Sequence, residues 1–154
     1  MPEPTKSKPP GVCWPVGGEI DILESYGDMM NNTAQGTLHF AKECNSDLRA
    51  GPNGRYPNIS GGAHEIDFSK DFHIYAVEWD ENCIKWFVDD HLYWRRWSGD
   101  EPSSHGALIP QTPFYVILNT AICWWNTGID GIFNPIMPVY HFIDHVRVFR
   151  AAVA

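Results

Sequence analysis

Apolar and polar residues alternate along much of the chain, and no stretch shows the spacing of an amphipathic helix. Gly, Pro, Asn and Asp separate the alternating stretches and mark turns. Asp89 and Asp90 are expected to form the turn of a hairpin. The pattern predicts seven strands: Ile20–Leu23, Thr37–Phe40, Phe72–Trp79, Ile84–Val88, Leu92–Trp94, Phe114–Leu118 and Phe142–Phe149.

Two segments with little periodicity, Cys44–Ala63 and Trp97–Pro113, are predicted to be long loops. The other connections are short, which favours antiparallel pairing. The sequence therefore predicts an all-β sandwich of the jelly-roll type. An immunoglobulin-like sandwich is the competing architecture, but the spacing of Cys and Trp does not fit it.

The charge of the chain narrows its possible partners. A net charge of −8, with Arg95-Arg96 as the only notable basic pair, argues against nucleic acid. No apolar run is long enough for a membrane helix, so no membrane segment is expected in this chain. A neutral polysaccharide is compatible with such a surface, and a monomer is expected.

The cysteines and two glycosylation sequons bear on the cellular compartment. No CxxC pair exists, which argues against a thiolate zinc site. The cysteines allow either two disulfides in three connectivities or buried thiols, and the sequence leaves both open. Although no signal peptide is visible, the cysteines and sequons together favour an extracellular or cell-wall protein. The cysteines are Cys13, Cys44, Cys83 and Cys123, and the sequons begin at Asn31 and Asn58.

The candidate chemistry lies in one short strand that carries three carboxylates, Glu19, Asp21 and Glu24, among apolar residues. Carboxylates that share a partly buried surface repel one another, so their pKa values separate and one can serve as acid and another as base. In a regular strand Glu24 would point away from the other two. We expect a β-bulge between Asp21 and Glu24 to return it to their face, at about the 5–5.5 Å carboxyl separation of a retaining glycosidase.

The segment Glu-Ile-Asp-Ile-Leu-Glu resembles the ExDxxE signature of glycoside hydrolase family 16, the laminarinase-like group. The segments that extend this resemblance, in the family's order, are Gly36–Phe40, Phe72–Trp79, Ile84–Asp89, Pro113–Asn119 and Ile143–Phe149. The resemblance implies a concanavalin A-like jelly roll with a concave glucan-binding cleft. It implies that Glu19 is the nucleophile, Glu24 the general acid/base and Asp21 the carboxylate that assists them.

Four further residues are predicted to bind the substrate: Trp14, His39, Asn119 and Trp125. Trp14 and His39 match residues of the family beside the scissile bond, although either would otherwise be read as structural. Trp125 follows the predicted Phe114–Leu118 strand, in a stretch where the family usually has glycine-rich sequence. It is a candidate for lining the cleft.

The expected activity is retaining, endo-acting hydrolysis of a β-1,3 or mixed β-1,3/1,4 glucan by two carboxylates. Three alternatives stay open: a cell-wall glucan transglycosylase, a galactan hydrolase, and a non-catalytic β-glucan lectin on the same scaffold. The lectin is disfavoured because all three carboxylates are present, and a low content of Lys and Arg argues against a sulfated galactan.

Residues 1–12 form a Pro-rich segment, and residues 13–151 are expected to be the C-terminal portion of the catalytic domain, without its N-terminal strands. No cofactor is predicted. The resemblance allows a structural calcium near Asp144, which is not predicted here. His141 and His145 would share a strand face, but no third ligand is evident and surface histidines are favoured.

Overall fold

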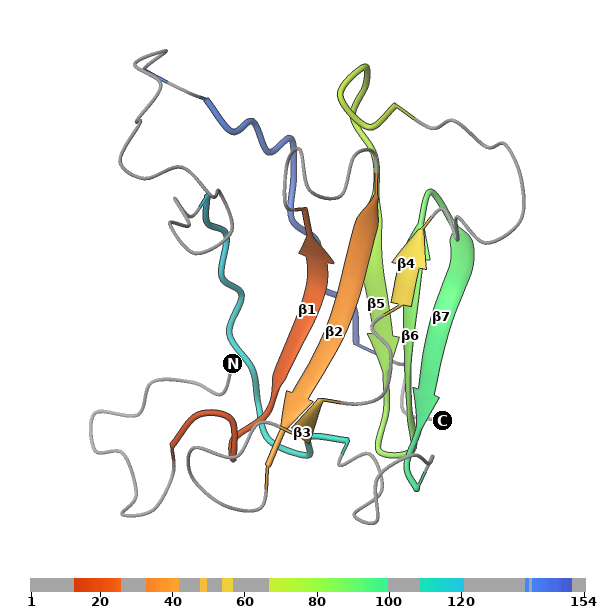
Figure 1. Ribbon diagram of the computed structural model, residues 1–154, viewed down its shortest axis with the longest axis vertical. Coiled ribbons are helices and arrows are strands. Elements are labelled where there is room, and N and C mark those ends of the chain that lie inside the picture. The colour runs from red at the N-terminus through yellow and green to blue at the C-terminus, as the bar shows by residue number, and fades with distance from the viewer. Residues whose placement is uncertain are drawn as a thin grey trace, which may run out of the picture. The chain divides into compact units, whose positions relative to one another are not determined.

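The structure is a computed structural model that describes residues 13–25, 33–41, 48–49, 54–56, 67–99, 109–120, 138 and 140–150. These residues form strands and connecting segments, without a helix among them. The strands belong to two antiparallel sheets (Figure 1). The strands are β1 (Glu19–Glu24), β2 (Ala34–Phe40), β3 (Leu48–Arg49), β4 (Gly54–Tyr56), β5 (Tyr75–Trp79), β6 (Cys83–Val88) and β7 (His91–Trp97).

In the first sheet β2 lies between β1 on one side and the two short strands β3 and β4 on the other. In the second sheet β5, β6 and β7 follow one another as a meander. Asp89 and Asp90 form the tight turn between β6 and β7, with φ of 48° and 63°. Positive φ at both central residues is typical of a type I′ hairpin turn, which confirms the predicted hairpin.

The core lies where one face of the first sheet packs on the second. Leu38 and Phe40 of β2 and Ile84 and Trp86 of β6 form one buried cluster, which Ile109 joins. Ile20 of β1 and Val77, Tyr93 and Trp94 of the second sheet pack around it. Because side chains alternate along a strand, the residues of β2 between these apolar positions face the other side of the sheet. That other side carries the candidate site.

Two glycines allow the tryptophans of the second sheet to approach the backbone of the first. A Cβ atom at Gly36 would lie 2.4 Å from Trp86 Cδ1, and one at Gly54 would lie 2.2 Å from Trp94 Cγ. The two indole rings are themselves in contact, with ring centroids 4.3 Å apart. The sheets are therefore joined by two tilted rings in contact, each of which packs against a glycine of the first sheet.

Gly36→Ala is expected to lower the free energy of unfolding by about 1–3 kcal/mol, the usual cost of overpacking a core. The added methyl group must displace the fully buried Trp86 ring. Urea denaturation of the variant and the wild type measures the difference. Asp90→Gly is the control, because glycine suits a positive φ and is expected to leave stability unchanged or raise it. Equal stability of Gly36→Ala and wild type would contradict the packing described here.

Two predicted strands are wrong in the structure. Phe114 makes only a single bridge, and neither residues 115–118 nor residues 142–149 lie in a strand. Alternation of apolar and polar residues predicts extended chain, whereas a strand also needs continuous pairing with a neighbouring backbone. Neither segment forms such a ladder among the described residues. The predicted loop Cys44–Ala63 is also wrong in part, because it contains β3 and β4, which pair with β2.

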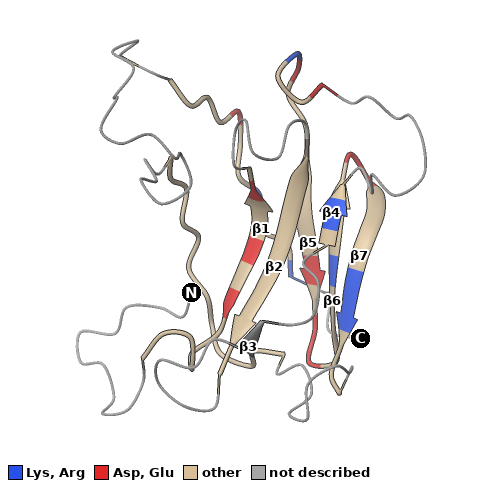
Figure 2. Cartoon of the chain, in the orientation of Figure 1, with Lys and Arg blue, Asp and Glu red and all other residues tan. Residues whose placement is uncertain are grey.

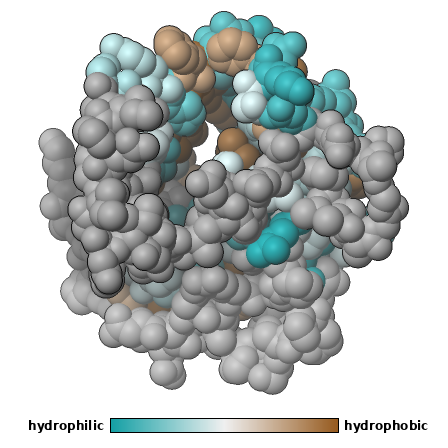
Figure 3. Space-filling view, turned by 45° about the horizontal axis from the view of Figure 1, so that its top comes forward, coloured by the Kyte–Doolittle hydropathy of each residue, from teal (hydrophilic) through white to brown (hydrophobic). Residues whose placement is uncertain are grey.

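The chain divides into two compact units, residues 1–117 and 118–154, and both sheets belong to the first. In the second unit the described apolar side chains are exposed, for example Tyr140 at 70% and Phe149 at 85%. Hydrophilic and hydrophobic residues both reach the described surface (Figure 3). Within the described part of the chain, no helix has the length and apolar character to span a membrane.

The cysteines differ from both sequence-based possibilities. Cys13 is disulfide-bonded, whereas Cys83 is a buried thiol on β6. With one thiol, four cysteines cannot make two disulfides, and with one disulfide they cannot all be thiols. Cys44, Cys123 and the sequon residues Asn31 and Asn58 lie outside the described residues.

Candidate active site

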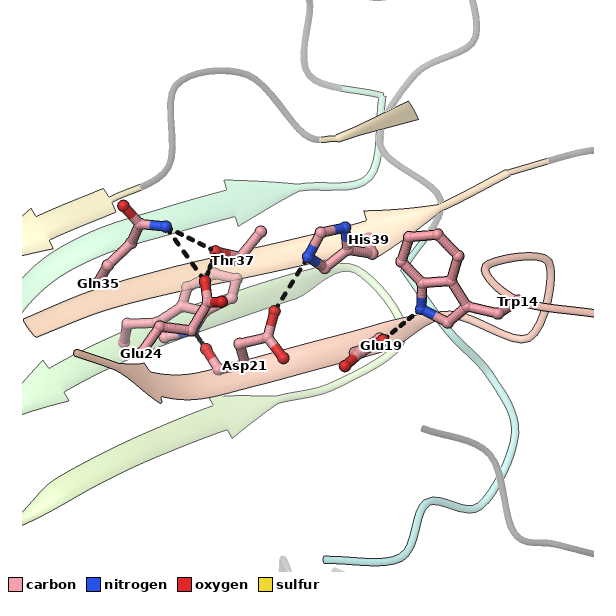
Figure 4. Close-up of polar contacts among 8 residues, drawn as sticks. Trp14, Glu19, Asp21, Glu24, Gln35, Thr37 and His39 are labelled. Atoms are coloured by element: carbon pink, nitrogen blue, oxygen red, sulfur yellow. Dashed lines mark hydrogen bonds and ion pairs between the residues drawn. The ribbon is translucent and has the colours of Figure 1, made fainter. Parts of the chain in front are cut away.

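The three carboxylates of β1 lie on one face of the first sheet because the strand contains a bulge. Glu19 pairs with His39, Asp21 with Thr37 and Glu24 with Gln35, and the register shifts between Asp21 and Glu24. The partners on β2 are two residues apart, so they share a face, and the carboxylates opposite them share it too. The bulge predicted from the spacing is thus confirmed (Figure 4). Acidic residues lie on β1 and β5, whereas basic residues lie on β4, β6 and β7 (Figure 2).

Glu19 begins the strand and is held by Trp14. Gly18, with φ of 79°, turns the chain into β1, and its backbone N–H donates to the carbonyl of Pro15 at 2.9 Å. The Trp14 indole Nε1 donates to Glu19 Oε2. The Trp14 ring is 45% exposed and lies 5.5 Å from the His39 ring, centroid to centroid. Because an indole N–H is only a donor, this contact orients the Glu19 carboxylate at the start of β1.

Asp21 lies in the middle of the row and faces His39, with 3.2 Å between Asp21 Oδ2 and His39 Nε2. Burial raises the pKa of Asp21 above its usual 3.8. The hydrogen bond from His39 opposes this rise, and the nearby Glu24 and Glu19 add to it. A carboxyl that retains its proton more readily can share it with a neighbouring carboxylate, which suits the assisting role predicted for Asp21.

Glu24 is held by two polar side chains of β2. Thr37 Oγ1 lies 2.5 Å and Gln35 Nε2 lies 3.1 Å from Glu24 Oε2. Both of these residues are buried, whereas Glu24 itself is partly exposed. Arg55 on β4 in turn donates from Nε to Gln35 Oε1 at 3.0 Å. The contacts form a chain from Arg55 through Gln35 to Glu24.

A hydrogen bond from the core side of the sheet stabilises the bulge. The indole of Trp86 on β6 donates from Nε1 to the backbone carbonyl of Asp21 at 2.8 Å. That carbonyl stands where the ladder between β1 and β2 loses its regular register. A buried donor from the opposite sheet thus satisfies a backbone acceptor at the irregular point of the strand.

Asp21→Asn is expected to raise the melting temperature by a few degrees at about pH 7 and to leave it unchanged at about pH 3. A carboxyl whose pKa is raised by folding contributes stability below its usual pKa, and that contribution is lost as pH rises through the raised value. Asparagine carries no charge at either pH, so the variant does not lose this stability as the pH rises. Thermal melts across this range measure the effect, and an equal shift at both pH values would contradict it.

The structure does not test two of the predicted substrate-binding residues. Asn119 is an exposed residue of the second unit, and Trp125 lies outside the described residues. Their roles stay predictions. The structure brings together the other five: Trp14, Glu19, Asp21, Glu24 and His39.

No group of three or more His, Cys, Asp or Glu residues in the described part of the chain has a metal-binding arrangement. His145 contacts the neighbouring Asp144 at 3.1 Å, and His141 contacts Thr120 at 3.1 Å.

Sequence reasoning missed Gln35, Thr37, Arg55 and Trp86 as residues of the site. A weak signal existed for the first two, because Gln35, Thr37 and His39 are polar residues at alternate positions of one strand. Arg55 lies in a segment predicted to be a loop, and Trp86 reads as a core residue, which it also is.

The chain is similar to known proteins of one family. The model of the family described as Glycosyl hydrolases family 16 matches residues 9–130. A Beta-glucanase of Rhodothermus marinus is 32% identical to the chain, over 89% of this chain and 46% of that protein. A Glucan endo-1,3-beta-glucosidase A1 of Niallia circulans is 30% identical, over 89% of this chain and 20% of that protein.

A third relative, a Beta-1,3-glucan-binding protein of Penaeus monodon, is 29% identical over 78% of this chain and 36% of that protein. The chain spans less than half the length of each of these three relatives.

Proposed function

The chain belongs to the glycosyl hydrolases of family 16, and from that membership and its row of carboxylates we propose that it acts in hydrolysing a β-glucan. The proposed reaction is endo-acting and retaining, at β-1,3 or mixed β-1,3/1,4 bonds. The observation that carries the proposal is the bulge that brings Glu19, Asp21 and Glu24 to one face. Two carboxylates flanking a glycosidic bond are the usual machinery of this reaction.

In the first step, Glu19 attacks the anomeric carbon while Glu24 gives its proton to the glycosidic oxygen. The bond between the anomeric carbon and that oxygen breaks, and its electron pair leaves with the departing sugar. In the second step, Glu24 takes a proton from water, and the water oxygen displaces Glu19. Two displacements at one carbon return the original configuration.

The neighbours of the two glutamates suit these roles. Trp14 donates a hydrogen bond to Glu19, which orients the nucleophile. Asp21 lies between the two glutamates with a raised pKa, so it can hold a proton near Glu19 during the cycle. The exposed ring of Trp14 offers an apolar face on which a sugar ring can stack.

The proposal is tested by incubating the chain with laminarin and with a mixed-linkage glucan and measuring released reducing ends. Proton NMR of the first products reports their anomeric configuration before mutarotation. Release of β-anomers supports a retaining enzyme. Early products of intermediate length support cleavage inside the glucan chain. Release of α-anomers, or no release from a chain that melts cooperatively, would contradict it.

Glucan binding without turnover is a second candidate function, and the similarity to a glucan-binding relative favours it. A lectin needs no paired acid and nucleophile, so the intact row of carboxylates favours hydrolysis. Calorimetric binding of laminarin without any product would favour the lectin. A transglycosylase would instead yield products longer than the substrate.

We also propose that the protein acts outside the cell or in the cell wall. The disulfide of Cys13 supports this location, because structural disulfides persist mainly in oxidising compartments. Detection of the protein in the culture medium or wall fraction would support it, and recovery only from the cytosol would contradict it.

A further inference from the structure

The acid/base Glu24 has one oxygen that is occupied by two neighbours. Glu24 Oε2 lies 3.1 Å from Gln35 Nε2 and 2.5 Å from Thr37 Oγ1 (Figure 4). Gln35 is 3% exposed and Thr37 is 1% exposed. Buried polar groups of this kind keep a defined set of hydrogen bonds, because losing one leaves a buried group unsatisfied.

Arg55 decides which way the amide of Gln35 points. The two ends of a glutamine amide have nearly the same shape, so packing alone does not fix its orientation. A guanidinium has only donors, and Arg55 Nε lies 3.0 Å from the amide oxygen Oε1. The cross-strand pairing of Gln35 with Arg55 sets this contact. The amide nitrogen must therefore face Glu24.

The proton of Thr37 is directed in the same way. Thr37 Oγ1 accepts from Gln35 Nε2 at 3.3 Å, so its own proton is available for Glu24 Oε2. Glu24 Oε2 then accepts two hydrogen bonds. A protonated carboxyl carries its proton on one oxygen, and Oε2, facing two donors, is the unfavourable one.

We propose that Arg55 is a positioning residue which, through Gln35, keeps the acid proton of Glu24 on Oε1. The inference rests on the proposed function. The proton on Oε1 passes to the glycosidic oxygen as the bond to the anomeric carbon breaks and Glu19 bonds to that carbon. Without Arg55, the amide of Gln35 can rotate so that its oxygen faces Glu24 Oε2. That oxygen would then hold the proton and donate it to Gln35, away from the substrate.

The test compares Arg55→Met with wild type, using two substrates. Laminarin has a sugar as its leaving group and needs the acid, whereas a 2,4-dinitrophenyl β-laminaribioside has a leaving group that needs no proton. We expect kcat/KM on laminarin to fall about 10- to 100-fold, part of the usual worth of general acid catalysis. We expect kcat/KM on the dinitrophenyl substrate to stay within about twofold of wild type.

Arg95→Met is the matched control, because it removes an exposed arginine from β7 in the second sheet. It is expected to leave both rates unchanged. An equal fall on both substrates for Arg55→Met would overturn the proposal, since it would indicate a general structural role. No fall on laminarin would overturn it as well. Wild type that hydrolyses neither substrate would overturn the proposed function and this role of Arg55 with it.

A measurement without turnover tests the orientation itself. The Gln35 Nε2 protons are held by Glu24 and Thr37 in the wild type, so they are expected to exchange slowly with solvent. In Arg55→Met their exchange is expected to be at least about tenfold faster, because the amide is free to rotate. Unchanged exchange in the NMR spectrum would overturn the assignment of orientation to Arg55, whatever the activity of the protein.

Discussion

Glu19→Ala is expected to lower kcat on laminarin by about 10⁴-fold or more, the largest effect of any single substitution in this chain. The methyl group cannot form the covalent intermediate, and the Trp14 indole loses its acceptor. The measurement is the rate of reducing-end release. Added azide is small enough to enter the space left by the carboxylate. With a dinitrophenyl glycoside it should attack from the nucleophile's side and yield an α-glycosyl azide.

Glu78→Ala is the control for this variant. Glu78 is an exposed glutamate of β5 that contacts Lys85 at 3.5 Å, in the other sheet. Its replacement removes the same charge and is expected to leave the rate unchanged. Retention of more than about 1% of wild-type activity by Glu19→Ala would assign the nucleophile to another residue.

Glu24→Ala is expected to lower kcat/KM on laminarin by about 10²- to 10⁴-fold, the range for loss of a general acid. Formation of the glycosyl-enzyme from a dinitrophenyl substrate should be nearly unaffected, because that leaving group needs no proton. The intermediate should then accumulate, since no base activates water. A burst of dinitrophenolate in stopped-flow measurements records it.

Azide distinguishes this residue from Glu19. It needs no general base, so it should react with the accumulated intermediate of Glu24→Ala and give a β-glycosyl azide. Formation of an α-glycosyl azide would instead indicate that Glu24 is the nucleophile and Glu19 the acid/base. Equal losses on laminarin and on the dinitrophenyl substrate would contradict the role of Glu24 as an acid.

The sequence was sufficient for the parts of the fold that depend on local pattern. The β5–β6–β7 meander was predicted because its strands alternate and the Asp89-Asp90 turn is explicit. The bulge was predicted because the spacing of Asp21 and Glu24 is odd, whereas carboxylates that share a site must share a face.

The parts that depend on partners distant in sequence were not predictable in this way. Leu48–Arg49 and Gly54–Tyr56 are too short to show a period, and they become strands only because β2 offers backbone bonds. The segment Phe142–Phe149 shows the period, yet it lies in no strand. The alternation of apolar and polar residues indicates which side chains a segment could bury. Whether the segment becomes a strand depends on which backbone lies beside it.

The residues of the candidate site also fall into those that local sequence reveals and those that depend on strand pairing. Glu19, Asp21 and Glu24 were identified because three charges in one apolar strand require an explanation. Gln35 and Arg55 were missed because each is an ordinary strand or loop residue when read alone. Their importance comes from the pairing of β2 with β4, which no local pattern reveals.

The hydrogen bond from Trp86 to the Asp21 carbonyl has a consequence for how such a protein can diverge. The spacing of the carboxylates is secured from the interior, by an indole that no substrate touches. Residues around the carboxylates and their polar partners can therefore change, and with them the preferred polysaccharide, while the chemistry persists. Trp86 and Gly36 lack that freedom, since the ring fits only where the facing residue has no side chain. Selection for new specificities should thus leave the core side of β1 and β2 fixed, keep the carboxylates with their polar partners, and accumulate changes around them.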